Sequence, residues 1–219
     1  MKIRHPDRRQ AGDAVHIVGS AVTLSSSVTI AGLTLTGGAT LALAANGGRV
    51  LRTSSLAISS DSALNLNDND LILDYTLASP LGAWDGSAYT GVTSMIARGY
   101  NYSAWDGSGL VTTTADARAG LTTLAPVEAS QLLGVTGSQT AMWHGQTVDG
   151  TTVIVKYTYA GDLDLNGLVD AADYGVIDNW VQFPGTNGYA NGDINYDGVI
   201  DAGDYGYIDN GFQVHGPPL

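Results

Sequence analysis

The sequence contains no cysteine, which excludes a disulfide scaffold and a metal site built from thiolates. It also lacks any run of about 18 apolar residues, the length that a membrane-spanning helix needs. No secretory leader is visible, because the stretch after the first ten residues carries Asp13 and His16 where a leader has an apolar core. We therefore expect a chain whose leader is missing or a piece of a longer exported protein.

Charged residues are few, and both their types and their positions are unevenly distributed. Of the 21 acidic residues, Glu128 is the only glutamate. Because Asp favours turns where Glu favours helices, we expect little helix. Lys and Arg are missing after Lys156, whereas ten aspartates lie between Asp162 and Asp209. The net charge of −12 argues against a nucleic-acid partner.

A twelve-residue pattern occurs twice in the acidic C-terminal stretch. The first copy begins at Asp162 and reads Asp-Leu-Asp-Leu-Asn-Gly-Leu-Val-Asp-Ala-Ala-Asp; the second begins 31 residues later, at Asp193, and reads Asp-Ile-Asn-Tyr-Asp-Gly-Val-Ile-Asp-Ala-Gly-Asp. Oxygen-bearing side chains stand at positions 1, 3, 5, 9 and 12 of each copy, with Gly at position 6. This is the spacing of an EF-hand-type calcium loop, in which alternate residues point inward and Gly makes the sharp bend.

The spacing predicts two calcium ions, one in each copy. Asp, Asn and Gly also form ordinary turns, but turn formation does not require this twelve-residue spacing twice. Ten acids without a base would repel one another, which also favours bound cations. The expected ligands are Asp162, Asp164, Asn166, the carbonyl oxygen of Leu168, Asp170 and Asp173 in the first loop, and Asp193, Asn195, Asp197, the carbonyl oxygen of Val199, Asp201 and Asp204 in the second.

Each loop is followed by a helical pattern, whereas the preceding residues 151–159 are predicted to form a strand. This duplicated loop and helix resembles the dockerin domain, whose paired half EF-hands bind calcium and, in many members, dock onto cohesin modules. The resemblance covers residues 161–219 and implies calcium binding. The partner expected is another copy of this chain, and a cohesin-like protein is the alternative. The loops depart from the usual EF-hand in two ways, because position 12 is Asp and no amphipathic helix precedes either loop. The partner-recognition surface of dockerins is matched less well, because positions 10 and 11 are Ala171-Ala172 and Ala202-Gly203.

Residues 16–75 repeat a short unit in which two apolar residues flank a small or polar one. This alternation predicts very short strands joined by tight corners, as in a short right-handed β-solenoid. A β-sandwich is the alternative. The texture resembles the strand repeats of bacterial autotransporter-like and planctomycete surface proteins, which often precede dockerin-like tails. The pairs are Val22/Leu24, Val28/Ile30, Leu33/Leu35, Leu41/Leu43, Leu56/Ile58, Leu64/Leu66 and Leu71/Leu73.

The fold class expected is therefore mainly β with a small α C-terminal domain. We predict a basic N-terminal arm over residues 1–15, a β-rich domain over residues 16–160 and a calcium-binding domain over residues 161–219. The arm holds Lys2, Arg4, Arg8 and Arg9. Within the β-rich domain we predict two helices that cap the last turn. One spans residues 91–98 and is ended by Gly99; the other spans residues 126–133, with Pro126 in its first turn and Gly134 at its end.

One pair of motifs could belong to an enzyme. Trp84-Asp-Gly-Ser87 and Trp105-Asp-Gly-Ser108 place Asp85 and Asp106 beside aromatic residues, as a two-carboxylate glycosidase site would. Asp-Gly is more often a turn, and Trp more often supplies core area. We therefore expect no catalytic residues and no enzyme activity.

Three functions remain open. The first is a non-enzymatic, calcium-binding structural protein of a bacterial surface layer or fibre, whose copies join head to tail. The second is a docking module that anchors a longer secreted protein to a cohesin-like receptor, and the third is a fragment of a polysaccharide-active enzyme. Because calcium is abundant outside the cell, we expect an extracellular or cell-surface location.

Overall fold

Residues 14–74 form a β-solenoid of three turns in the computed structural model, which describes residues 12–219. Each turn gives one strand to each of three sheets, and each strand pairs in parallel with its counterpart in the next turn. The prediction of a solenoid is confirmed, and the sandwich alternative is wrong for these residues. The strands are β1 (Ala14–Val18), β2 (Ala21–Leu24) and β3 (Val28–Ile30), then β4 (Gly32–Thr36), β5 (Thr40–Leu43) and β6 (Val50–Thr53), then β7 (Leu56–Ile58), β8 (Ala63–Asn65) and β9 (Asp70–Asp74).

Aliphatic side chains stack along the inside of the coil. Val15 of β1 pairs with Leu33 of β4, which pairs with Leu56 of β7. In a second sheet, Leu41 of β5 pairs with the fully buried Leu64 of β8. The period-two pattern therefore places one apolar side chain over the next at each turn, so a single core runs along the solenoid.

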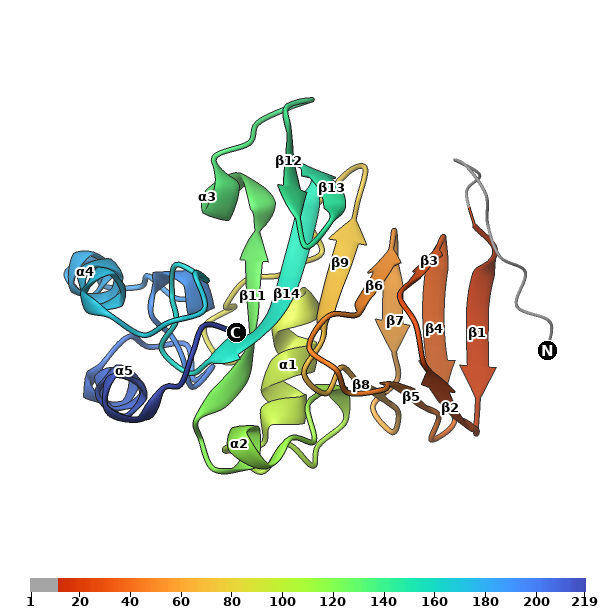
Figure 1. The fold of residues 1–219 in the computed structure, drawn as a ribbon, viewed down its shortest axis with the longest axis horizontal. Coiled ribbons are helices and arrows are strands. Elements are labelled where there is room, and N and C mark those ends of the chain that lie inside the picture. The colour runs from red at the N-terminus through yellow and green to blue at the C-terminus, as the bar shows by residue number, and fades with distance from the viewer. Residues whose placement is uncertain (1–11) are drawn as a thin grey trace.

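The third turn is continued by strands from later in the chain. β10 (Gly109–Val111) pairs in parallel with β8, and β14 (Thr152–Tyr159) pairs antiparallel with β9. β11 (Thr122–Glu128) pairs with β14 and forms the edge of that sheet (Figure 1). The strand predicted for residues 151–159 is confirmed. The parallel coil of the solenoid therefore ends where one of its sheets continues with antiparallel strands.

The helix predicted for residues 91–98 exists but is longer. α1 (Gly91–Tyr100) continues through Gly99 and ends at Asn101, whose φ of 39° lies in the left-handed region. Gly99 has a packing role, because a Cβ at this position would lie 1.9 Å from the carbonyl oxygen of Leu110. The prediction that Gly99 ends the helix is wrong, since close approach of β10 and not a turn requires this glycine.

The second predicted helix is shorter than expected. Pro126 lies within β11, opposite Val155 of β14, and α3 (Ala129–Leu133) begins only after Glu128. Because β11 is an edge strand, it tolerates a residue without an N–H group. The predicted end is confirmed, since Gly134 closes α3 with a φ of 66°.

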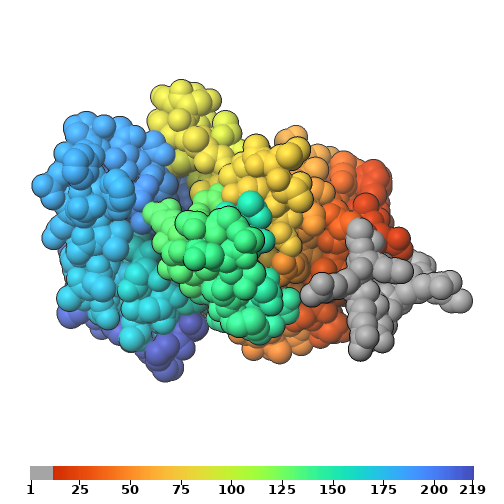
Figure 2. Space-filling model, turned by 90° about the horizontal axis from the view of Figure 1, so that it is seen from above, coloured from red at the N-terminus to blue at the C-terminus, as the bar shows by residue number. Residues whose placement is uncertain are grey.

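The remaining elements lie around and beyond this sheet. α4 (Ala171–Trp180) and α5 (Ala202–Val214) lie at the opposite end of the molecule from β1 (Figures 1 and 2). The predicted basic arm falls mostly outside the described residues, and Ala14 and Val15 belong to β1. Over residues 12–219, none of the helices has the length and apolar character needed to cross a membrane. The elements are α2 (Ala115–Arg118), β12 (Thr140–Trp143), β13 (Gln146–Asp149), α4 (Ala171–Trp180), the 3-10 helix η1 (Tyr189–Asn191) and α5 (Ala202–Val214).

Candidate metal centre

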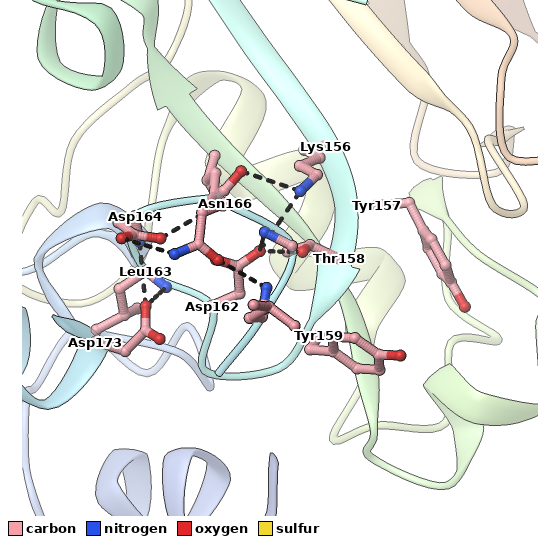
Figure 3. A network of polar contacts seen from close by, with 12 residues as sticks. Lys156, Tyr157, Thr158, Tyr159, Asp162, Leu163, Asp164, Asn166 and Asp173 are labelled. Carbon is pink, nitrogen blue, oxygen red and sulfur yellow. Dashed lines mark hydrogen bonds and ion pairs between the residues drawn. The ribbon is translucent and has the colours of Figure 1, made fainter. Parts of the chain in front are cut away.

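Three carboxylates converge in the first acidic loop, which we call loop 1 (residues 162–173). Asp162, Asp164 and Asp173 each place an oxygen so that the three lie within 4.8 Å of one another. Asp162 follows the end of β14, and Asp173 lies in the first turn of α4 (Figure 3). Residues far apart in the loop thus meet at one point, as the predicted spacing requires for a cation site.

Asp162 is the most constrained of these residues. Its side chain is fully buried. One oxygen, Oδ2, accepts hydrogen bonds from the Gly167 amide at 2.9 Å and from the Thr158 hydroxyl. The other, Oδ1, is buried and has no hydrogen-bond partner within residues 12–219. Leaving a buried carboxylate oxygen unsatisfied is costly, and a bound cation would satisfy it.

Asp173 closes the loop from the other side. Its Oδ1 accepts from the Leu163 amide at 2.7 Å, and its Oδ2 accepts from the Asp170 amide at 2.8 Å. Asp170 in turn is the N-cap of α4 and accepts from the Ala172 amide at 2.7 Å. These reciprocal bonds form a capping box, so the residue at position 12 also fixes the start of the helix.

Burial sets the charge balance of loop 1. It raises the pKa of Asp162 to about 6, above the usual value of 3.8. It also raises the pKa of Asp173, although three backbone amides oppose this shift. Loss of water disfavours the ionised form of a carboxylate, and a nearby cation favours it. The protein itself therefore supplies too little positive charge around these carboxylates to keep their pKa values at the usual level.

The second loop, which we call loop 2 (residues 193–204), repeats this geometry. Asp193 is fully buried, and its Oδ2 accepts from the Gly198 amide at 2.9 Å and from the Tyr89 hydroxyl. Asp204 accepts from the Ile194 amide at 2.8 Å and from the Asp201 amide at 3.0 Å. Burial raises the pKa of Asp193 and brings that of Asp204 to about 6. The sequence repeat is thus a repeat of hydrogen bonding and burial as well.

The backbone bends in the same way in both loops. Position 4 is left-handed in each, with φ of 56° at Leu165 and 63° at Tyr196. Position 6 is also at positive φ, with 92° at Gly167 and 86° at Gly198. The predicted role of Gly at position 6 is confirmed for the bend.

The predicted ligands at positions 3 and 5 differ between the two loops. Position 3 is Asp164 in loop 1 but Asn195 in loop 2, where the carboxylate of Asp197 stands at position 5. Within the described residues, only loop 1 brings three acidic side chains into one cluster. Asn195 offers an amide oxygen, which is also a ligand for calcium. Asp201, like Asp170, is a helix N-cap, here accepting from the Gly203 amide at 2.7 Å.

Sequence reasoning missed three residues that contact either Asp162 or Asp193, the first aspartate of each loop. Lys156 and Thr158 of β14 contact Asp162, and Tyr89 contacts Asp193 (Figure 3 shows the first contact). The spacing of Lys156 and Thr158 places them on one face of the strand, which is a signal the sequence carries. Tyr89 precedes Asp193 by 104 residues, so no local pattern could have revealed it.

The two helices that follow the loops are joined by side-chain hydrogen bonds. Tyr174 of α4 donates to Asp209 of α5 at 2.5 Å, and Tyr205 of α5 donates to Asp178 of α4 at 2.5 Å. The duplicated Tyr-Gly-Xaa-Ile-Asp-Asn sequence therefore produces a reciprocal pair of hydrogen bonds. This pairing holds the two loops in a fixed mutual arrangement.

Asp85 and Asp106 occupy exposed turns. Asp85 accepts hydrogen bonds from the amides of Ser87 and Ala88, which lower its pKa. Asp106 accepts from the Asn101 side chain at 2.8 Å. A lowered pKa is opposite to what a general acid needs, so the geometry of Asp85 fits a turn residue better than a glycosidase acid.

Comparison with known proteins identifies no relative. No protein-family model, no curated protein and no solved structure matches the chain.

Proposed function

We propose that this chain is a non-enzymatic structural protein that binds one calcium ion in each of loops 1 and 2. The observation that carries this proposal is the buried Oδ1 of Asp162, which has no hydrogen-bond partner in the described chain and belongs to a cluster of three carboxylates. An acidic cluster on the surface would not need an ion, but this buried oxygen does.

Calcium fits the donors better than other metals do. The side chains available are carboxylates and amides, with the backbone carbonyls of Leu168 and Val199 at position 7. Oxygen-only sites of this size favour hard cations, and the flexible twelve-residue loop fits calcium better than the smaller, octahedral magnesium ion. The ions would supply the positive charge that the C-terminal sequence lacks.

The direct test is calcium binding by the full chain. Isothermal titration of calcium-free protein should show two ions per chain. Asp162→Ala and Asp193→Ala should each remove one ion, because each deletes the buried carboxylate at position 1. Asp116→Ala, in the short helix α2, is a matched control that should keep both. Failure to bind calcium would contradict the proposal.

We further propose that copies assemble head to tail at an extracellular bacterial surface. Among residues 12–219, β1, β2 and β3 each lie at the edge of their sheet, so the first turn presents strand edges to which another chain could pair. Residues 1–9 carry four basic side chains, and the tail after Asp162 carries no base. Opposite charges at the two ends favour a repeating contact, which grows a filament unless it closes into a ring.

Negative-stain microscopy of the purified chain in calcium should therefore show filaments. A chain lacking residues 1–15 should assemble less well, since it loses the four bases and part of β1. Equal assembly by the shortened chain would contradict the role of the arm, and a full-length chain that stays monomeric in calcium would contradict assembly altogether.

A second candidate function is docking onto a cohesin-like receptor. It is favoured by apolar side chains that remain exposed at the C-terminal end, namely Val181, Phe183, Phe212 and Val214. Exposed apolar groups of this size often belong to a protein interface. Calcium-dependent binding of the full chain to an immobilised cohesin module, lost in a Phe183→Ser and Phe212→Ser double variant, would support docking over self-assembly.

A further inference from the structure

Loops 1 and 2 differ in one charged contact. Lys156 lies in β14 with only 2 % of its surface exposed, and its Nζ is 3.6 Å from Oδ2 of Asp162. The same Nζ donates to the carbonyl oxygen of Leu165, at position 4 of loop 1, at 3.0 Å. A buried ammonium group is therefore built into the wall of loop 1.

Loop 2 shares the hydroxyl contact of loop 1 but, within residues 12–219, has no ammonium group beside it. Oδ2 of Asp193 accepts from the hydroxyl of Tyr89, just as Oδ2 of Asp162 accepts from the hydroxyl of Thr158, and each oxygen also accepts from the glycine amide at position 6. Within residues 12–219, the ion pairs are Arg52–Asp74, His144–Asp70 and Lys156–Asp162, and none of them involves loop 2. Within the described part of the chain, Lys156 is thus a charged partner that loop 1 has and loop 2 lacks.

The number of acidic side chains in the loops does not offset this difference. Each loop carries four aspartates and one asparagine at the five oxygen-bearing positions. The lysine therefore leaves loop 1 one unit of charge less negative than loop 2. Because the contact is buried, neither water nor salt screens it as strongly as a surface pair.

We propose that Lys156 sets the order in which the loops fill: its ammonium group weakens calcium binding at loop 1, so loop 2 fills first. This inference rests on the proposed calcium function. Lys156 has a second effect on the calcium-free chain, because it partly compensates the buried charge of Asp162.

The experiment is calcium titration of the full-length chain by calorimetry. Wild-type protein should show two separate steps. Asp164→Ala and Asp197→Ala assign these steps, because both side chains form hydrogen bonds only within their own loops. Asp197→Ala should remove the tighter step and Asp164→Ala the weaker one. This assignment tests the order of filling without altering Lys156.

Lys156→Gln then tests the cause. Glutamine lacks the charge but retains an N–H donor for the Leu165 carbonyl oxygen. The affinity of loop 1 should rise about tenfold or more, as expected from removing a buried unit charge close to the ion, while loop 2 keeps its affinity. Thr158→Val is the matched control, because it deletes a neutral hydrogen bond to the same oxygen of Asp162 and should not tighten loop 1.

The outcomes separate the two proposals. If calcium binds but Asp197→Ala removes the weaker step, or the two wild-type steps have equal affinity, the proposed order is overturned. If Lys156→Gln leaves the affinity of loop 1 unchanged or lowers it, the role of the lysine is overturned. If neither loop of the wild-type chain binds calcium, the proposed function fails and this inference fails with it.

Discussion

The two ends of the molecule bury opposite kinds of side chain. The solenoid encloses leucines such as Leu35 and Leu64, each fully buried, whereas the loop region encloses the carboxylates of Asp162 and Asp204, which are equally buried. Apolar burial is favourable by itself, at about 25 cal/mol per Å². Burial of a carboxylate is unfavourable unless a partner compensates its charge. We therefore expect the solenoid to be stable without a ligand and the loop region to depend on one.

Calcium removal should separate the two regions most strongly. A ligand present at 100 times its Kd stabilises the fold by about 2.7 kcal/mol per site, or about 5 kcal/mol for two sites. Thermal unfolding of the full chain should therefore occur at a clearly lower temperature in excess EGTA than in calcium. Curves that superimpose under the two conditions would show that the loop region needs no ion.

A cavity in the solenoid should have the next largest effect. Leu64→Ala should cost about 2–5 kcal/mol of unfolding free energy, because it leaves a cavity in a fully packed core. The loss should be the same in calcium and in EGTA, measured by urea unfolding. Val18→Ala is the control: Val18 is 58 % exposed, so its substitution should cost little. A calcium-dependent loss in Leu64→Ala would mean that the solenoid and the loops are not energetically separate.

The pH dependence of stability should differ between the calcium-free and calcium-bound states. In the calcium-free fold the pKa values of Asp162 and Asp204 are raised to about 6, so the folded state binds protons more readily than the unfolded state. Its stability should therefore rise as the pH falls from about 7 to about 5, by roughly 1–3 kcal/mol. In calcium, protons compete with the ion, so the stabilisation by calcium should shrink over the same range.

Melting temperatures at pH 5 and pH 7, each with calcium and with EGTA, would measure this difference. A solenoid variant such as Leu64→Ala should show the same two trends, because it leaves the loop carboxylates unchanged. Parallel trends with calcium and with EGTA would contradict the assignment of these carboxylates to the ion sites.

Tyr196→Phe should separate stability from calcium binding within loop 2. The hydroxyl of Tyr196 donates to the carbonyl oxygen of Leu124 in β11, and removing it leaves a buried acceptor unsatisfied. The expected cost is about 1–3 kcal/mol of unfolding free energy. Calcium affinity, measured by titration, should stay at the wild-type value because the side chain faces β11. A large loss of affinity would place this tyrosine in the ion site instead.

The smallest effect is expected at Asp85 and Asp106. Both are exposed, and Asn substitutions keep an oxygen acceptor, so the unfolding free energy should change by less than about 0.5 kcal/mol. We also expect no hydrolysis of plant or algal polysaccharides that depends on either residue. Cleavage that disappears in Asp85→Asn or Asp106→Asn would instead support the hypothesis of a polysaccharide-active enzyme.

The sequence predicted those features that depend on local spacing. Alternating apolar residues such as Leu33 and Leu35 predicted the solenoid, because a strand has a fixed period of two. The loop pattern predicted which carboxylates of loop 1 would meet, because Gly167 bends the chain at a fixed place. Local reasoning failed at Pro126, since a proline fits either a first helical turn or an edge strand.

The sequence by itself determined the strand period and the identity and spacing of the loop oxygens, because both follow from backbone geometry over a few residues. Only the tertiary structure decided which loop oxygens are buried and what surrounds them. Lys156 reaches Asp162 because β14 runs past loop 1, and Tyr89 reaches Asp193 because the segment before α1 folds against loop 2. These contacts join residues that local pattern cannot relate, and they make two nearly identical loops electrostatically different.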